Sequence, residues 1–151
     1  MRCSIVLGAF LVTGLLACGE NSHETTKATG SETASPDGKN CYAYFSPTDT
    51  VTLIFSGPDT AIRGSLVYAY AGKDRNLGSI QGRLKGDTLV ADYRFHSEGK
   101  ESVREVVFLR SGNQMKEGFG SVMEQDGKMV FINHAQLSFG DSFVLEAQNC
   151  R

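Results

Sequence analysis

The segment from Asn76 to Gly99 carries the clearest alternation of apolar and polar side chains in the chain. Alternate positions of a strand face the same side of a sheet. The apolar positions are Ile80, Gly82 and Leu84 in the first half, and Leu89, Ala91, Tyr93 and Phe95 in the second. Between the halves, Gly86 and Asp87 predict a two-residue type II′ turn, because glycine accepts the positive φ of its first position. This turn sets Ile80 opposite Tyr93 and places every apolar residue on one face of a β-hairpin.

Short apolar runs of the same kind recur along the rest of the chain after residue 40, with turn residues between them. The further segments with strand-like patterns are Cys41–Phe45, Thr50–Ser56, Ala61–Ala71, Ser102–Arg110, Gln114–Glu124, Met129–His134, Gln136–Phe139 and Phe143–Ala147. Asp126 and Gly127, between two of them, predict a type I′ turn. No segment has a persuasive helical period. The spacing therefore predicts an all-β fold, an antiparallel up-and-down meander of about eight to ten strands.

Shared faces and turn residues also predict how neighbouring segments pair. Setting Phe55 opposite Ile62 keeps the apolar residues of two consecutive segments on one side. Gly140 and Asp141 predict the turn of a final hairpin between the last two segments. Ser102–Arg110 has apolar residues on both faces, so its pattern does not indicate which face points inward.

Glycines inside the predicted strands favour a closed barrel over a sandwich, because glycine in a strand marks tight bends where a sheet closes on itself. These residues are Gly64, Gly82, Gly118 and Gly120. With its even meander and aromatic-rich inner face, the region resembles the lipocalin and avidin type of barrel. The resemblance implies the fold and says nothing of a ligand. The inner aromatic side chains line a cavity for a small apolar ligand or fill the interior; they are Tyr68, Tyr70, Tyr93 and Phe95.

The N-terminus has the pattern of an export signal. Arg2 supplies a positive charge, and Ile5–Leu16 is an apolar run that is shorter than the about 20 residues of a membrane-spanning helix. The end of this run, Leu15-Leu16-Ala17-Cys18, resembles the lipobox of bacterial lipoproteins. The alternatives are an ordinary secretory signal that happens to contain a cysteine, and a short uncleaved anchor.

The lipobox resemblance implies cleavage before Cys18, diacylglycerol on its sulfur and acylation of the new amino group. Two or more acyl chains would attach the protein stably to a membrane, in the cell envelope, and Gly19 after the cysteine favours the outer membrane over the inner one. The polar run that follows contains too few apolar residues to fold. We thus divide the chain into a signal peptide (1–17), a lipidated Cys18 with a disordered linker (18–40) and a β-barrel domain (41–151).

The chain has four cysteines, and their positions predict one disulfide. Cys3 leaves with the signal and Cys18 carries lipid, so Cys41 and Cys150 remain at the two ends of the folded region. In an exported protein, such a pair indicates a disulfide that closes the domain end to end. A metal site or a reactive thiol is the alternative, and no Cys-x-x-Cys motif supports it.

Charge and motif content narrow the function classes. The chain has 17 acidic and 15 basic side chains, so no basic surface favours nucleic acid. No nucleophile with a base, no carboxylate pair and no cofactor motif is present, which predicts a non-enzymatic protein without a cofactor. Methionines 115, 123 and 129 near His134 raise soft-metal binding, but their spread over separate segments favours core filling, and we expect no metal.

One turn gathers charged residues and is a candidate for recognition. It contains Ser97, Glu98, Lys100 and Glu101. A solvated hairpin turn is the simpler interpretation, although loops on a rigid scaffold often carry function. The sequence as a whole predicts a lipid-anchored envelope lipoprotein whose barrel is a binding or interaction module. A carrier of a small apolar ligand and a protein inhibitor of an envelope or host hydrolase are the alternatives, the latter resembling the lipoprotein inhibitors of lysozyme.

Overall fold

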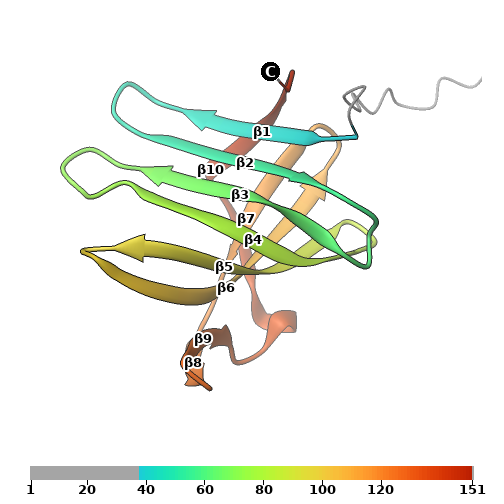
Figure 1. Cartoon of the computed structure of the whole chain (residues 1–151). Coiled ribbons are helices and arrows are strands. Elements are labelled where there is room, and N and C mark those ends of the chain that lie inside the picture. Colours follow the sequence, from blue (N-terminus) through green and yellow to red (C-terminus); the bar gives the residue numbers. More distant parts are fainter. Residues whose placement is uncertain (1–37, 151) are drawn as a thin grey trace, which may run out of the picture.

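The structure is a computed structural model and describes residues 38–150. Eight antiparallel strands close into a barrel, as the sequence predicts (Figure 1). The barrel strands are β1 (Asn40–Phe45), β2 (Thr50–Ser56), β3 (Ile62–Ala69), β4 (Asn76–Lys85), β5 (Thr88–Ser97), β6 (Lys100–Ser111), β7 (Gln114–Phe119) and β10 (Ser138–Gln148). Consecutive strands pair from β1 to β7, and β10 pairs with both β7 and β1 to close the ring.

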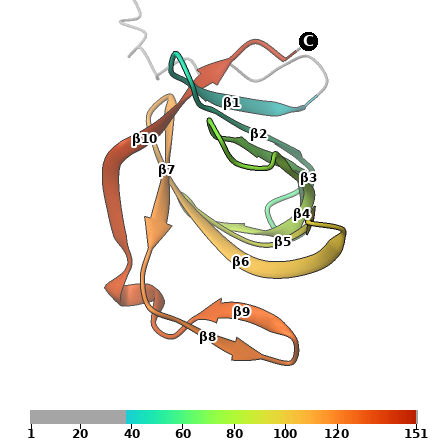
Figure 2. The same ribbon diagram turned by 90° about the vertical axis from the view of Figure 1, so that its left-hand side faces the viewer.

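A small hairpin interrupts the meander between β7 and β10. It consists of β8 (Val122–Gln125) and β9 (Lys128–Phe131), followed by the 3-10 helix η1 (His134–Gln136), and lies outside the barrel (Figure 2). Its turn residues Asp126 and Gly127 both have positive φ, 53° and 75°, as a type I′ turn requires. The single strand expected over Gln114–Glu124 is therefore wrong: two strands form, separated at Gly120 and Ser121.

The predicted central hairpin is confirmed in its register. Ile80 lies opposite Tyr93 and Leu84 opposite Leu89. Gly86 takes a positive φ of 59°, as expected for the first residue of a type II′ turn. The alternation identified the correct register because a slip of one residue would have turned one apolar face to water.

The predicted register of β2 and β3 is wrong by two residues, since Phe55 lies opposite Gly64 and not Ile62. A shift of two keeps every side chain on the same face, so alternation does not distinguish the two registers. A Cβ on Gly64 would lie 2.7 Å from the Cα of Phe55, so glycine permits this approach of the strands. The loop between β2 and β3 is closed by a hydrogen bond from the Ala61 N–H to the carbonyl oxygen of Pro58, at 2.8 Å.

The predicted final hairpin through Gly140 and Asp141 is also wrong. These residues lie within the single strand β10, where the pairing with β7 shifts between Phe139 and Val144. The second side of β7 and that of β1 still need partners to close the ring, and the long strand β10 supplies hydrogen bonds to both. Asp141 accepts from the Lys116 ammonium at 2.6 Å and helps to hold this irregular part of β10 against β7.

The predicted disulfide is confirmed between Cys41 on β1 and Cys150 just after β10, with 5.5 Å between the Cα atoms. The signal peptide (1–17), Cys18 and the linker up to residue 37 lie outside the described residues. Asn40, assigned to the linker, is already the first residue of β1. Between residues 38 and 150, no helix is long and apolar enough to cross a membrane.

Buried apolar side chains from all eight barrel strands meet inside the barrel, Tyr42 supplying the contribution of β1. They include Leu53, Phe55, Ile62, Leu66, Ile80, Leu89, Val106, Phe108, Met115 and Leu145, each at most 2% exposed. This cluster is the hydrophobic core, and it occupies much of the interior. Burial on this scale is the main driving force for folding of a small domain.

Candidate functional site

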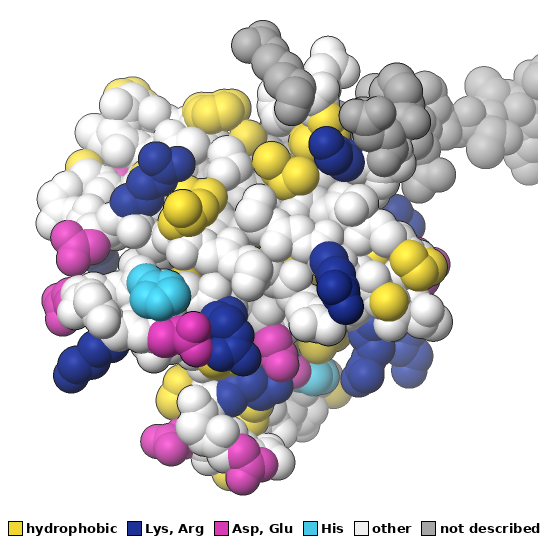
Figure 3. Space-filling model, viewed as in Figure 1, with side chains coloured by type: hydrophobic (Ala, Val, Ile, Leu, Met, Phe, Trp, Pro, Cys, Tyr) yellow, Lys and Arg dark blue, Asp and Glu magenta, His cyan; other side chains and the backbone are white. Residues whose placement is uncertain are grey.

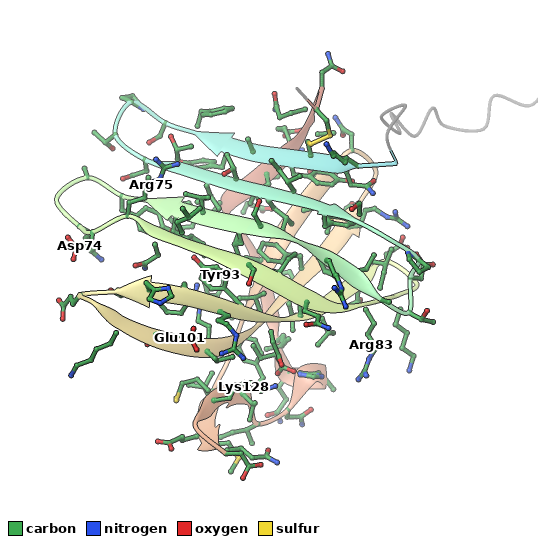
Figure 4. All side chains as sticks on the ribbon, viewed as in Figure 1. Asp74, Arg75, Arg83, Tyr93, Glu101 and Lys128 are labelled. Atoms are coloured by element: carbon green, nitrogen blue, oxygen red, sulfur yellow. A yellow bond between two sulfur atoms is a disulfide. The ribbon has the colours of Figure 1, made fainter. Side chains whose placement is uncertain are left out.

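The two ends of the barrel differ in what surrounds them. One end holds the disulfide and the β2–β3 and β4–β5 connections; the other is formed by the β1–β2, β3–β4 and β5–β6 connections, and we call it the mouth (Figure 1). The residues of these mouth connections are Ser46–Asp49, Tyr70–Arg75 and Glu98–Gly99. Figure 4 labels Asp74 and Arg75 at this end. The polar groups described below are inside the barrel, toward this end.

Six aromatic rings form a continuous series just inside the mouth, which we call the aromatic arc. In contact order its members are Tyr44, Phe143, Tyr70, Tyr68, Tyr93 and Phe95, with successive ring centroids 5.3, 5.8, 5.9, 5.8 and 4.7 Å apart. Such separations are typical of favourable aromatic pairs. The structure thus brings together all four of the interior aromatic residues singled out from the sequence.

Arg104 of β6 lies across this arc. Its guanidinium carbon is 5.1 Å from the ring centroid of Tyr68, 5.6 Å from that of Tyr93 and 5.9 Å from that of Phe95. A cation at such distances is attracted by the negative faces of the rings. The Arg104 side chain is nevertheless 41% exposed, so a cation is presented to solvent from within an aromatic surround.

Glu117 of β7 is the buried acidic partner of this cation, and the residue as a whole is 7% exposed. Its Oε1 accepts a hydrogen bond from the Tyr68 hydroxyl at 2.7 Å and lies 3.8 Å from Nη2 of Arg104. Burial raises the pKa of Glu117, while the Tyr68 hydrogen bond and the Arg104 charge partly oppose that rise. A carboxyl in this position is held by specific partners, and its charge is balanced by Arg104.

The tyrosine hydroxyls of the arc share this low-polarity surrounding. Burial is the main cause that raises the pKa of Tyr68 well above its usual value, and the negative charge of Glu117 adds to it. Burial likewise raises the pKa of Tyr93 to about 12, although the Arg104 charge opposes the rise. These hydroxyls are therefore neutral donors at physiological pH, and neither is prepared to act as a base.

Two polar atoms beside the arc are buried and have no hydrogen-bond partner among the described residues: Nε of Arg104 and Oδ1 of Asn76. Asn76 lies opposite Tyr68 in the sheet, and its carbonyl oxygen accepts from the Tyr93 hydroxyl at 3.0 Å. Buried polar groups are almost always satisfied, and an orphan is costly. The mouth thus contains one unused donor and one unused acceptor, both next to the same two tyrosines.

The sheet register explains how Arg104 and Glu117 reach the site, and sequence analysis missed both. Arg104 lies opposite Tyr93, and Glu117 lies opposite Phe108, so each shares the inward face of its neighbour. Extending the inward face of the central hairpin across to β6 would have identified Arg104. The apolar residues on both faces of β6 hid that signal.

The charged turn proposed for recognition is a tight hairpin turn between β5 and β6. Glu98 and Gly99 are its two central residues, with φ of 50° and 74°. Ser97 pairs with Lys100 on either side of them, and Glu101 accepts from Arg94 at 2.5 Å on an exposed surface. The β5–β6 turn lies at the mouth end of the barrel (Figure 1), and none of its residues belongs to the aromatic arc.

The residues weighed for metal binding lie in two places, Met115 in the barrel and the others in the outer hairpin and the 3-10 helix after it. Met115 is part of the core, as expected, whereas Met123 and Met129 are 48% and 40% exposed on the outer hairpin, so core filling is wrong for these two. His134 contacts Glu105 at 2.8 Å. Over residues 38–150, His, Cys, Asp and Glu side chains form no group of three or more that could hold a metal ion.

The outer wall of the barrel carries interspersed charges of both signs (Figure 3). A groove of about 440 Å³ lies there, lined by residues of β3 to β6, the β2–β3 loop and Lys128. Within it, Lys128 donates to Asp92 at 2.6 Å and ties the outer hairpin to the barrel. The wall is thus a mixed polar surface, in contrast to the aromatic mouth.

No protein family, no curated protein and no solved structure matches the chain.

Proposed function

We propose that the protein is a lipid-anchored lipoprotein of the cell envelope, more specifically of the outer membrane, and that its barrel is a non-enzymatic binding module. The observation that carries the binding role is Arg104, an exposed cation held over three aromatic rings at one open end of the barrel. Aromatic walls with a few placed polar groups are the usual composition of a small-ligand site. The mouth is accordingly the proposed binding surface.

The arrangement supports binding at the mouth over the two alternative functions. A carrier with a deep cavity would need space that the core cluster occupies. An inhibitor that inserts a long loop into an enzyme would need more chain than the two-residue turn at Glu98 and Gly99 provides. Binding at the mouth needs neither a deep cavity nor a long loop, because the polar groups that would contact a ligand lie just inside the end of the barrel.

A binding assay tests the module. We expect a small-molecule fraction extracted from the cell envelope to raise the unfolding temperature of the full-length protein in detergent, because a ligand that binds only the folded state stabilises it. Arg104→Gln should abolish the rise. Arg94→Gln, which removes an exposed arginine of β5 outside the arc, should preserve it. A rise that survives Arg104→Gln would place the binding elsewhere.

The lipid anchor has its own test, which rests on the lipobox-like segment Leu15-Leu16-Ala17-Cys18. We expect a radiolabelled fatty acid fed to the producing cells to label the protein, and Cys18→Ser to remove the label. Membrane fractionation then checks that the label lies in the outer membrane. Equal labelling of wild type and Cys18→Ser would refute the anchor without touching the mouth.

A further inference from the structure

The unpaired polar atoms of the mouth indicate what a ligand must supply. Nε of Arg104 is a donor and Oδ1 of Asn76 is an acceptor, and both are buried without a partner. Both flank Tyr68 and Tyr93. A ligand that satisfies both needs an acceptor for Arg104 and a donor for Asn76. Because the Arg104 side chain is partly exposed, it can turn toward such a ligand and bring its unused N–H with it.

The charges of the mouth favour a neutral ligand. Arg104 would attract an anion, but Oε1 of Glu117 is 3.8 Å from its Nη2 and balances its charge. A second anion would meet that carboxylate, and a cation would meet Arg104. The site offers hydrogen bonds from a charged donor without offering a net charge.

The aromatic arc supplies an apolar surface to the same ligand. Tyr44, Tyr70, Phe95 and Phe143 are each partly exposed along the arc, and Arg104 lies over the Phe95 end of it. Rings in this setting pack against compact C–H surfaces, such as the face of a sugar ring or a methyl group. The ligand therefore combines a neutral donor–acceptor group with a small apolar face.

From these features we infer that the mouth binds an N-acetylated amino sugar, an inference that rests on the proposed function. Its acetamido oxygen accepts from Nε of Arg104, its amide N–H donates to Oδ1 of Asn76, and its methyl group and ring face pack against the arc. Both unsatisfied atoms then gain a partner, and no charge is buried. The sugar binds non-covalently, and the side chains of Arg104 and Asn76 turn toward it as it binds.

A peptide amide offers the same donor and acceptor, but the barrel disfavours it. Peptides are commonly bound by adding a strand to an exposed sheet edge. The strands that hold the arc, β1, β3, β5 and β10, each pair on both sides within the closed barrel. Beside the arc, β3 and β5 are paired on both sides, and β1 leaves only Tyr44 and Phe45 without a β10 partner. A two-residue edge is too short for an added strand, so a compact sugar fits better than an extended chain.

Tyrosine fluorescence of the full-length protein in detergent tests the inference. The chain has five tyrosines and no tryptophan, and four of them, Tyr44, Tyr68, Tyr70 and Tyr93, lie in the arc. We expect N,N′-diacetylchitobiose to change the emission saturably and to raise the unfolding temperature. Cellobiose, which lacks the amides, should do neither. Equal responses to both disaccharides, or a response only to an N-acetylated dipeptide amide, would overturn the inference.

Variants at the two unpaired atoms sharpen the test. Arg104→Gln and Asn76→Ala should each weaken diacetylchitobiose binding about tenfold, as expected for the loss of one hydrogen bond to a ligand. Arg104→Lys keeps the charge but has no guanidinium fork, so it should weaken binding as well. Arg94→Gln is the matched control and should bind as the wild type does. Undiminished binding by folded Asn76→Ala would also overturn the inference, even if Arg104→Gln fails to fold.

The two proposals fail in different ways. If diacetylchitobiose has no effect while the envelope fraction still stabilises the protein through Arg104, the sugar assignment is wrong and the binding role stands. If neither stabilises a folded protein, both proposals fall. A buried water that satisfies the two atoms would leave the emission and unfolding temperature unchanged by any sugar, and that result also overturns the inference.

Discussion

Glu117 shows how burial and specific partners compete at a single residue. The raised pKa means that its protonated form suits the folded state better than its ionised form does. The folded pKa lies above the unfolded value of 4.5, so the stabilising contribution of protonation is full below pH 4.5 and is lost as the pH rises through the folded pKa. Glu117→Gln removes this titration and keeps an acceptor for Tyr68.

We therefore expect the stability of the wild type relative to Glu117→Gln to increase as the pH falls toward 4.5. Chemical denaturation of both proteins across a pH series measures this difference. Tyr68→Phe is the control, because it keeps the carboxyl and should retain a pH dependence. A difference that does not change with pH, or that falls on acidification, would contradict the buried position of the carboxyl.

Gly78 is required where it lies because the ring of Tyr93 and the Cβ of Phe95 lie directly over it. A Cβ there would come within 2.2 Å of the Arg94 carbonyl oxygen and 2.6 Å of Cε2 of Tyr93. We expect Gly78→Ala to destabilise the protein by about 1–3 kcal/mol, the usual cost of overpacking a core, and to alter tyrosine emission. Urea unfolding measures the loss.

Gly140→Ala is the matched control for this change, because a Cβ at Gly140 would meet nothing within 4 Å. It should change the free energy of unfolding by less than about 0.5 kcal/mol, as surface substitutions usually do. If both alanine variants have the same stability, the close packing at Gly78 is not what the structure describes.

The sequence predicted only some of the individual residues of the site. The aromatic members of the site followed from alternation, because an aromatic side chain on an apolar face is expected to point inward. Arg104 and Glu117 did not follow, since alternation treats a charged residue as an outward one. A charged pair that points inward is found only when the register of the neighbouring strands is known.

Among the elements, the β5–β6 turn has a residue poorly suited to its conformation. Glu98 has a φ of 50°, which costs a non-glycine residue about 1–2 kcal/mol unless it is Asn or Asp. We expect Glu98→Asn to raise the free energy of unfolding by about 1 kcal/mol, because Asn-Gly is the favoured type I′ pair. Thermal unfolding followed by circular dichroism checks the direction.

The β8–β9 turn provides the comparison. Asp126 occupies the equivalent position with a φ of 53° and is followed by glycine in the same way. Asp126→Asn should therefore leave the unfolding temperature nearly unchanged. Equal gains in the two turns would mean that the backbone conformation of Glu98 is not the cause.

Strand pairing was predicted correctly where the turn between two strands leaves one register, and wrongly where a longer connection allows more than one. The hairpin of β4 and β5 was correct because a two-residue turn leaves one register. The longer β2–β3 loop allowed a shift of two residues that alternation does not detect. For β10, a local Gly-Asp turn signal was overridden because the strand must pair with β7 and β1 to close the barrel.

For the whole molecule, closure of the barrel connects fold and site. The site residues come from seven strands, β1, β3 to β7 and β10. Only a closed ring connects Arg104 of β6 to Phe143 of β10 through the rings of Tyr68 and Tyr70. The sequence predicted the barrel from strand spacing and interior glycines. It did not predict the site, because the site depends on how those strands are ordered around the ring.

The Cys41–Cys150 disulfide fastens the ring at the end away from the mouth, where β1 and β10 share only a few paired residues. It closes a loop with a sequence separation of 109 residues. In the chain-entropy picture a loop of about 100 residues corresponds to about 4.7 kcal/mol, and natural disulfides in small exported domains contribute about 2–5 kcal/mol. We expect the double variant Cys41→Ser, Cys150→Ser to lose stability within that range, measured by urea unfolding. Reduced wild type should unfold at the same urea concentration as this variant.

Because the mouth lies at the opposite end, the folded double variant should keep the tyrosine emission of the wild type. Unchanged stability would mean that strand pairing alone closes the barrel, whereas altered emission in the folded state would mean that closure at one end governs the arrangement of Arg104 and the arc at the other.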